Sequence, residues 1–202
     1  MDTSIKIIKI SKLEDDKFLK PFRIDFEQNG VRRHWDCVNV HDSVAALLYH
    51  RQKDAILLVK QFRAPVWYYQ TKHNTNQEME LGFTYELCAG IMDKGISREK
   101  TIKEEILEET GYLVEEVEYV TSCFNGLGFS ANQQTMFYAT IDESMKKGLG
   151  GGVDGEDIEL FFLPLKEAKS FIFDERLVKA PGLLYMIMWF LENKKELYKK
   201  SI

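Results

Sequence analysis

The segment from Glu86 to Leu113 constrains the chain most, because it joins a short apolar stretch, a glycine-bearing loop and a glutamate-rich run. Ser97 is a suitable N-cap, and Gly111 stands where a C′ glycine ends a helix. These signals predict a helix over residues 98–110. The loop before this helix would lie next to its first turn.

Three glutamates of this helix, Glu105, Glu108 and Glu109, fall within one arc of about 100° because spacings of three and four bring side chains together. Ile102 and Ile106 border that arc, so the carboxylates lie at the margin of the buried face. Carboxylates in such a place repel one another, and raised pKa values or a bound cation relieve the repulsion. Mg²⁺ or Mn²⁺ is the simplest cation, since both prefer oxygen ligands. A solvated acidic face is the alternative.

Composition describes an ordinary soluble globular protein with one main domain, since the 202 residues are 45% hydrophobic and 29% charged. The net charge of −5 gives no basic surface for a nucleic acid polymer. Three scattered cysteines without a CxxC pair favour reduced thiols and a cytoplasmic location. An apolar secretion signal and a membrane-spanning run are both lacking, so neither secretion nor a membrane is expected.

The rest of the chain predicts a mixed sheet with helices packed on it. An Asn29-Gly30 pair within alternating residues 22–38 predicts a β-hairpin. Strands are expected at 44–50, 55–62, 83–88, 118–124, 135–141 and 158–163, helices at 165–173 and from 181 onward, a surface loop at 64–82 and a mobile loop at 142–157.

One motif is a decoy. Residues 126–131 match the spacing of a GxGxxA dinucleotide fingerprint, but that fingerprint requires a helix to follow. Residues 133–141 have the pattern of a strand instead, so a dinucleotide site of this type is not expected.

The glycine and the glutamate helix together resemble the Nudix box, whose pattern is Gly, five residues, Glu, seven residues, then Arg-Glu-aliphatic-x-Glu-Glu-x-Gly-aliphatic. The positions in register are Gly90, Glu105, Ile106, Glu108, Glu109 and Gly111. Ile96 stands in place of the first box glutamate and Glu104 in place of the box arginine, while Tyr112 is a milder departure. Arg63 or a lysine could supply the missing cation, and the sequence leaves this choice open.

Residues 35–38, 58–63, 86–90 and 126–138 extend the resemblance to the nucleoside-diphosphate-sugar branch of this family, which includes the UDP-sugar and ADP-ribose pyrophosphatases. The resemblance implies an α/β fold, an α/β/α sandwich with a mixed sheet in residues 41–202. It also implies a small N-terminal β subdomain in residues 1–40 that makes the contact of a homodimer.

The activity implied is Mg²⁺-dependent hydrolysis of a nucleoside-diphosphate sugar, with UDP-glucose giving UMP and glucose 1-phosphate. ADP-ribose as substrate is the alternative. Because Ile96 and Glu104 depart from the box, a binding module without catalysis is an alternative of another class.

Carried over by position, the resemblance assigns roles to individual residues. The metal ligands would be the Ala89 carbonyl, Glu105, Glu108 and Glu109. The general base would be Glu156, or as a second choice Glu159. The alternative is that their loop is only a solvated surface segment without a catalytic role. Trp35 would stack on the nucleobase unless it is a core residue of the hairpin, Arg63 would hold phosphate, and Glu86 would contact substrate or support Arg63.

Overall fold

The computed structural model describes residues 8–10, 19–73, 79–153 and 155–197, and these form two compact units. The first unit covers the chain up to His41 together with Phe124–Asn132, and the second covers Asp42–Cys123 and Gln133 onward. No helix within the described ranges is long and apolar enough to cross a membrane.

The first unit contains the expected hairpin. Its strands are β1 (Lys20–Gln28) and β2 (Val31–Asn39). Asn29 and Gly30 both have positive φ, of 54° and 75°, as a two-residue turn between right-twisted strands requires. The antiparallel register places Ile24 opposite Trp35, with Phe22 and Phe26 on the same face, so this face of the ribbon is mostly apolar, with Arg33 opposite Phe26.

The second unit is built on a seven-stranded sheet with the order β5-β4-β3-β8-β7, in which β6 also pairs with β3 and β9 with β4. The strands are β3 (Ser43–His50), β4 (Ala55–Phe62), β5 (Phe83–Glu86), β6 (Cys88–Ile91), β7 (Glu118–Asn125), β8 (Asn132–Ile141) and β9 (Ile158–Pro164). The β3–β8 pairing is parallel, whereas β3 pairs antiparallel with β4 and β6, and β4 pairs antiparallel with β5 and β9, so the sheet is mixed as predicted.

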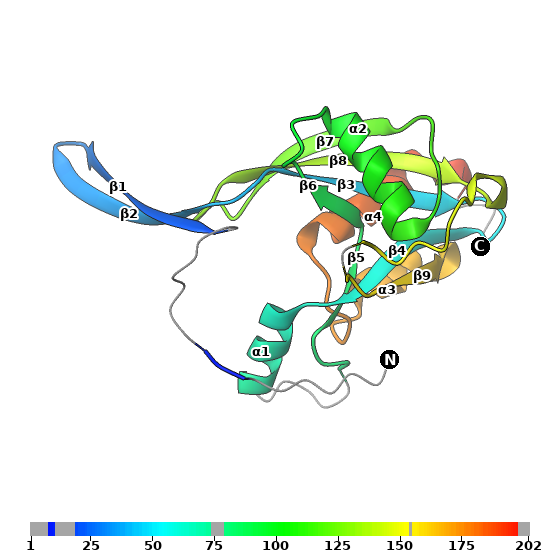
Figure 1. Cartoon of the computed structure of the whole chain (residues 1–202), viewed down its shortest axis with the longest axis horizontal. Coiled ribbons are helices and arrows are strands. Elements are labelled where there is room, and N and C mark those ends of the chain that lie inside the picture. The colour runs from blue at the N-terminus through cyan, green and yellow to red at the C-terminus, as the bar shows by residue number, and fades with distance from the viewer. Residues whose placement is uncertain (1–7, 11–18, 74–78, 154, 198–202) are drawn as a thin grey trace. The chain divides into compact units, whose positions relative to one another are not determined.

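Helices cover both faces of this sheet (Figure 1). They are α1 (Ala64–His73), α2 (Arg98–Glu105), the π-helix η1 (Ile106–Thr110), the 3-10 helices η2 (Glu143–Met145) and η3 (Leu165–Glu167), α3 (Ala168–Phe173) and α4 (Pro181–Asn193). Alternate β3 residues enter different cores: Leu47 packs with the α3 and α4 side, and Leu48 with the α2 and η1 side. This is the expected α/β/α sandwich.

The sheet opens where β3 and β4 separate. The first half of β3 pairs with β6 and its second half with β4, while the far end of β4 pairs with β5. The predicted single strand over 83–88 is therefore two strands, with Leu87 between them. Because β5 and β6 begin and end at this opening, Glu86 and Ala89 are placed on either side of it.

The prediction of a surface loop at 64–82 was wrong, because the first half of this segment is the helix α1. Residues 74–78 lie outside the described part of the chain. Pro65 can stand in the first turn, where its missing N–H is not needed. Gln70 is buried, and its Oε1 accepts a hydrogen bond of 2.7 Å from the Gly82 amide. The aromatic residues of this segment are weak helix formers, so local propensity alone does not predict α1. The hydrogen bond from Gly82 to Gln70 anchors the helix instead.

Candidate functional site

The glutamate helix is present over the predicted range and has the predicted caps. The Ser97 hydroxyl accepts a hydrogen bond from the Lys100 amide, and Gly111 ends the helix in the left-handed region at φ 76°. Its second half, Ile106–Thr110, is a π-helix, a feature often found at functional sites. No residue pattern in the sequence indicates that wider turn.

Two glutamates of the helix carry raised pKa values. Burial raises the pKa of Glu109 to about 8, against the opposing hydrogen bonds from Cys88 and the Ala89 amide, the latter at 3.1 Å. Burial, followed by repulsion from Glu108, raises the pKa of Glu105 to about 7. The carboxylates that the sequence placed at the core margin therefore lie in an environment that a bound cation would relieve.

Gly90 makes room for one of these carboxylates. A Cβ atom on Gly90 would collide with the carboxyl group of Glu105. Glycine at this position therefore lets the side chain of Glu105 lie directly against β6.

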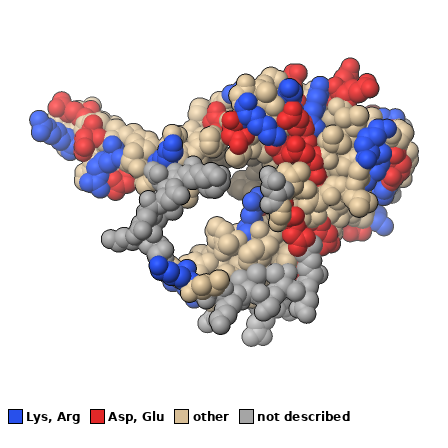
Figure 2. Space-filling view, in the orientation of Figure 1, with Lys and Arg blue, Asp and Glu red and all other residues tan. Residues whose placement is uncertain are grey.

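A lysine of the loop before the box helix, Lys94, lies beside two of its glutamates. Its Nζ lies 3.4 Å from Glu104 Oε2 and 3.7 Å from Glu108 Oε1. Figure 2 shows acidic and basic side chains interspersed over the region of α2. Arg63 pairs with Glu86, so the cations at Glu104, in the slot where the box has arginine, are lysines: Lys94 and, at 4.0 Å, Lys100.

Arg63 and Glu86 form a two-point ion pair at the opening of the sheet. Both Nε and Nη2 of Arg63 donate to the Glu86 carboxylate at 2.8 Å. Glu109 and Glu156 both act to raise the Arg63 pKa, after the larger effect of Glu86, so these carboxylates lie within electrostatic reach of the guanidinium. Thr84, which sequence reasoning missed, donates to Glu86 Oε1 at 2.6 Å. Its only signal was a two-residue spacing from Glu86 along a strand.

The glycine-rich loop is fastened to the end of the box helix. The Gly151 amide donates to the Glu109 carbonyl at 2.8 Å and the Gly152 amide to the Glu108 carbonyl at 3.3 Å. Glu156, in the same loop, contributes to the raised pKa values of Glu105 and Glu109.

Glu159 lies on β9 opposite Lys60, with its carboxylate 3.9 Å from Lys60 Nζ. It is not among the main charges acting on either raised glutamate. The structure thus groups Glu156, rather than Glu159, with the acidic helix.

Trp35 belongs to the first unit. Its Nε1 donates to the Gly128 carbonyl at 2.7 Å, while the side chain remains 54% exposed. The alternative that Trp35 is a buried core residue of the hairpin does not fit this exposure.

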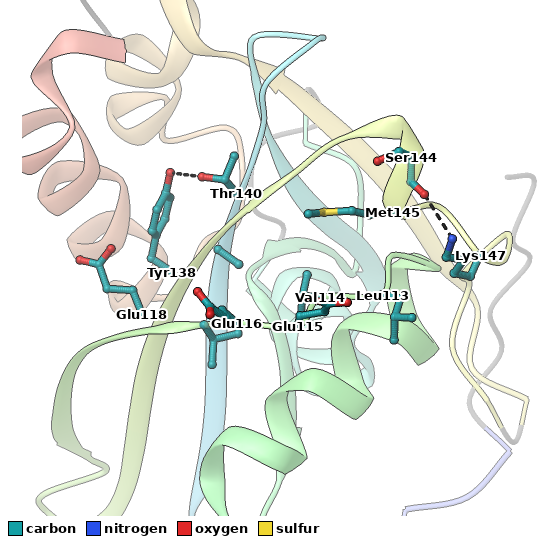
Figure 3. A pocket seen from close by; sticks show the side chains of 12 residues that line it. Leu113, Val114, Glu115, Glu116, Glu118, Tyr138, Thr140, Ser144, Met145 and Lys147 are labelled. Atoms are coloured by element: carbon teal, nitrogen blue, oxygen red, sulfur yellow. Dashed lines mark hydrogen bonds between the residues drawn. The ribbon is translucent and has the colours of Figure 1, made fainter.

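A cavity of about 660 Å³ in the second unit contains none of the predicted site residues. It is lined by segments 113–118 and 138–140 and by Ser144, Met145 and Lys147. Figure 3 shows the Tyr138 hydroxyl hydrogen-bonded to Thr140 at its edge, a 2.8 Å contact. This cavity and the acidic helix are therefore different places, and the raised pKa values of Glu105 and Glu109 favour the helix as the site.

The donor set suits a hard divalent cation, because Glu105, Glu108 and Glu109 supply oxygen and two of them are destabilised as free anions. Within the described ranges, no three carboxylate, imidazole or thiolate groups converge as a ready metal site. A bound ion would therefore have to draw these carboxylates together.

Comparison with known proteins agrees with this reading. A family model, the NUDIX domain, matches residues 39–187. The chain is 34% identical over 198 residues to mouse uridine diphosphate glucose pyrophosphatase NUDT14, covering 87% of this chain and 89% of that protein. It is 35% identical over 190 residues to GDP-mannose pyrophosphatase of Pectobacterium atrosepticum, covering 92% and 94%. The chain therefore belongs to the Nudix family.

Proposed function

We propose that this protein is a Mg²⁺-dependent pyrophosphatase of nucleoside-diphosphate sugars, with UDP-glucose giving UMP and glucose 1-phosphate. The observation that carries the proposal is the buried Glu109 and the half-buried Glu105, both with raised pKa values, beside the Arg63–Glu86 ion pair. The UDP-glucose and GDP-mannose pyrophosphatases among the relatives support the substrate class.

A metal bound by Glu105, Glu108, Glu109 and the Ala89 carbonyl would supply charge neutralisation for the diphosphate and a more acidic water. Mn²⁺ could take the same oxygen ligands.

The chain's own groups have separate tasks. Arg63 holds a phosphate with the N–H donors that Glu86 leaves free. Glu156 accepts the proton of the attacking water. The water's oxygen bonds to one phosphorus while the bond from that phosphorus to the bridging oxygen breaks, and the other phosphate leaves with the bridging oxygen. Trp35 stacks on the nucleobase through its exposed indole face.

Parallel hydrolysis assays on UDP-glucose, GDP-mannose and ADP-ribose, with Mg²⁺ or Mn²⁺ and with EDTA, test the proposal. UMP and glucose 1-phosphate should form fastest, and Glu109→Gln should slow their release by at least about 100-fold. Equal rates on all three substrates would refute the preference for UDP-glucose. Tight binding of a nucleotide sugar without turnover at any metal concentration would favour the binding module.

The proposal includes a homodimer in which residues 1–40 act as the contact subdomain. Supporting it, Phe22, Ile24 and Phe26 are 47%, 46% and 36% exposed on β1, on the face that β2 shares through Trp35. Apolar rows exposed on a two-stranded ribbon are typical of an interaction surface. A cytoplasmic location rests on the three cysteines, which are free thiols.

A further inference from the structure

Thr84 is a buried threonine whose hydroxyl points at the ion pair. The residue is 4% exposed on β5, and its Oγ1 lies 2.6 Å from Glu86 Oε1 and 3.3 Å from the Gln61 carbonyl. A hydroxyl has one proton to donate. The ionised carboxylate is closer and is the stronger acceptor, so the proton goes to Glu86.

Glu86 therefore accepts three hydrogen bonds, one from Thr84 and two from Arg63. Its Oε1 is shared by the Thr84 hydroxyl and Arg63 Nε, and its Oε2 takes Nη2. This arrangement fixes the carboxylate plane, and the two parallel bonds then fix the guanidinium plane. Arg63 has five N–H donors, so those not used by Glu86 remain for a ligand.

The pairing of β5 with β4 fixes the position of Thr84, from which the contacts run through Glu86 to Arg63. Thr84 and Glu86 alternate on one face of β5, and β5 is held in register on β4 by the Gln61–Thr84 and Val59–Glu86 pairs. Arg63 follows the end of β4, and its side chain is half-exposed. A long half-exposed side chain loses rotamer freedom when it binds a ligand, and holding it beforehand removes part of that loss.

We propose that Thr84 is a positioning residue, which holds Glu86 so that Arg63 presents its free donors to the diphosphate of the substrate. This inference rests on the proposed function, because it takes Arg63 as the phosphate-binding group. A purely structural threonine would instead need only its packing and its neighbouring backbone carbonyl.

Thr84→Val tests the inference, because it removes the hydroxyl and keeps the shape. Thr84→Ser is the conservative partner, since it keeps the hydroxyl. Thr135→Val is a matched control: Thr135 is also buried, at 1% exposure, and its hydroxyl meets Ser122 at 3.0 Å. Melting temperatures of all three variants establish that they are folded before the kinetics are compared.

With the nucleoside-diphosphate sugar that wild type hydrolyses fastest, we expect Thr84→Val to lower kcat/KM about tenfold, the scale of one hydrogen bond to a charged group. The loss should fall mainly on KM. Thr84→Ser should stay within about twofold of wild type in both constants, and Thr135→Val should leave KM unchanged. An unchanged KM in Thr84→Val, or equal losses in Thr84→Val and Thr84→Ser, would overturn the inference.

The two proposals fail in different ways. If wild type hydrolyses none of the sugars, the proposed function fails, and Thr84 is then tested by calorimetric binding of inorganic pyrophosphate with Mg²⁺. Weaker binding by Thr84→Val but not by Thr84→Ser supports the positioning role. Equal affinities, or no binding by wild type, overturn it.

Discussion

The Cβ position of Gly90 falls on the carboxyl group of Glu105, so the glycine of the box and its second glutamate occupy neighbouring space that no other residue type would leave free. Gly90 is not among the residues with positive φ. Glycine is therefore required at position 90 for space and not for backbone conformation, so an alanine there tests the effect of the added Cβ atom without backbone strain.

Gly90→Ala should displace the Glu105 carboxylate while leaving the fold in place, because the atoms in the way are the far end of a flexible side chain. We expect the free energy of unfolding without metal to change by less than about 1 kcal/mol. The rise in Tm on adding Mg²⁺ should largely disappear, and hydrolysis should fall at least about 100-fold. Gly148→Ala is the control, since its Cβ would meet only an ordinary contact at 3.9 Å. A Gly90→Ala protein with normal Mg²⁺ response would contradict the role assigned to Glu105.

The metal-free protein should lose stability as pH rises from about 5 to 8. Burial raises the pKa of Glu109 to about 8 and, with Glu108, that of Glu105 to about 7, from a common 4.5. The unfolded chain then binds fewer protons than the folded chain in this window. The stability that these two protonated carboxyls contribute is therefore fully present below pH 4.5 and is lost as the pH rises through their folded-state pKa values.

Thermal unfolding in EDTA across this pH range measures the effect, and Glu109→Gln should flatten the curve above about pH 7. Mg²⁺ should reverse the slope, because a metal binds ionised carboxylates and competes with protons. A Tm that rises with pH in EDTA would show that these carboxyls are not buried as described.

Lys94 should matter more to the metal-free protein than to the metal-bound one. It lies 3.4 Å from Glu104 and 3.7 Å from Glu108, where it offsets the repulsion of the acidic helix. Lys94→Met should lower stability in EDTA by up to about 1 kcal/mol, the range for exposed ion pairs. It should also increase the stabilisation by Mg²⁺, because a competing cation is gone. Lys100→Met is the control, since the one ion pair that Lys100 makes among the described residues is with Glu104, at 4.0 Å. An equal Mg²⁺ response in both variants would contradict this competition.

The sequence predicts the box helix well because its evidence is local. The Ser97 cap, the Gly111 stop and the buried Ile102 and Ile106 depend on spacing along one element, and each is found as expected. The π-helix escapes prediction, because hydrogen-bond slippage within a helix leaves no mark on residue type. Helix α1 escapes for another reason, since its anchor at Gln70 is a contact with Gly82 beyond the helix.

The ion pairs of the site are also beyond the sequence. Arg63 and Glu86 are predicted as site residues, but that Arg63 turns to Glu86 and Lys94 to Glu104 depends on where β4, β5 and the loop before α2 meet. Thr84 is chosen by strand alternation alone, which every residue of a strand shares. Spacing along the chain therefore finds the groups, whereas their pairing requires the sheet.

Variants of Glu156 and of Glu159 should differ strongly in kcat and in the shape of the pH–rate profile. Glu156 acts electrostatically on Glu105, Glu109 and Arg63, whereas Glu159 faces Lys60. Removing a general base lowers kcat about 10²–10⁴-fold. Glu156→Gln should therefore lose that much and also lose the acidic limb of the profile, while Glu159→Gln stays within a few-fold of wild type. The reverse ranking would transfer the base to Glu159.

The apolar face of the hairpin should set the oligomeric state. Ile24 faces outward beside Trp35, and an aspartate there would put a charge into a contact between two copies. Sedimentation of wild type should show about twice the 23.6 kDa chain mass, and Ile24→Asp should shift it to the single chain. Arg23→Ala is the control on the opposite face, where the Arg23–Asp36 pair is exposed and adds little to stability. A wild-type monomer, or an Ile24→Asp dimer, would rule out this face as the contact.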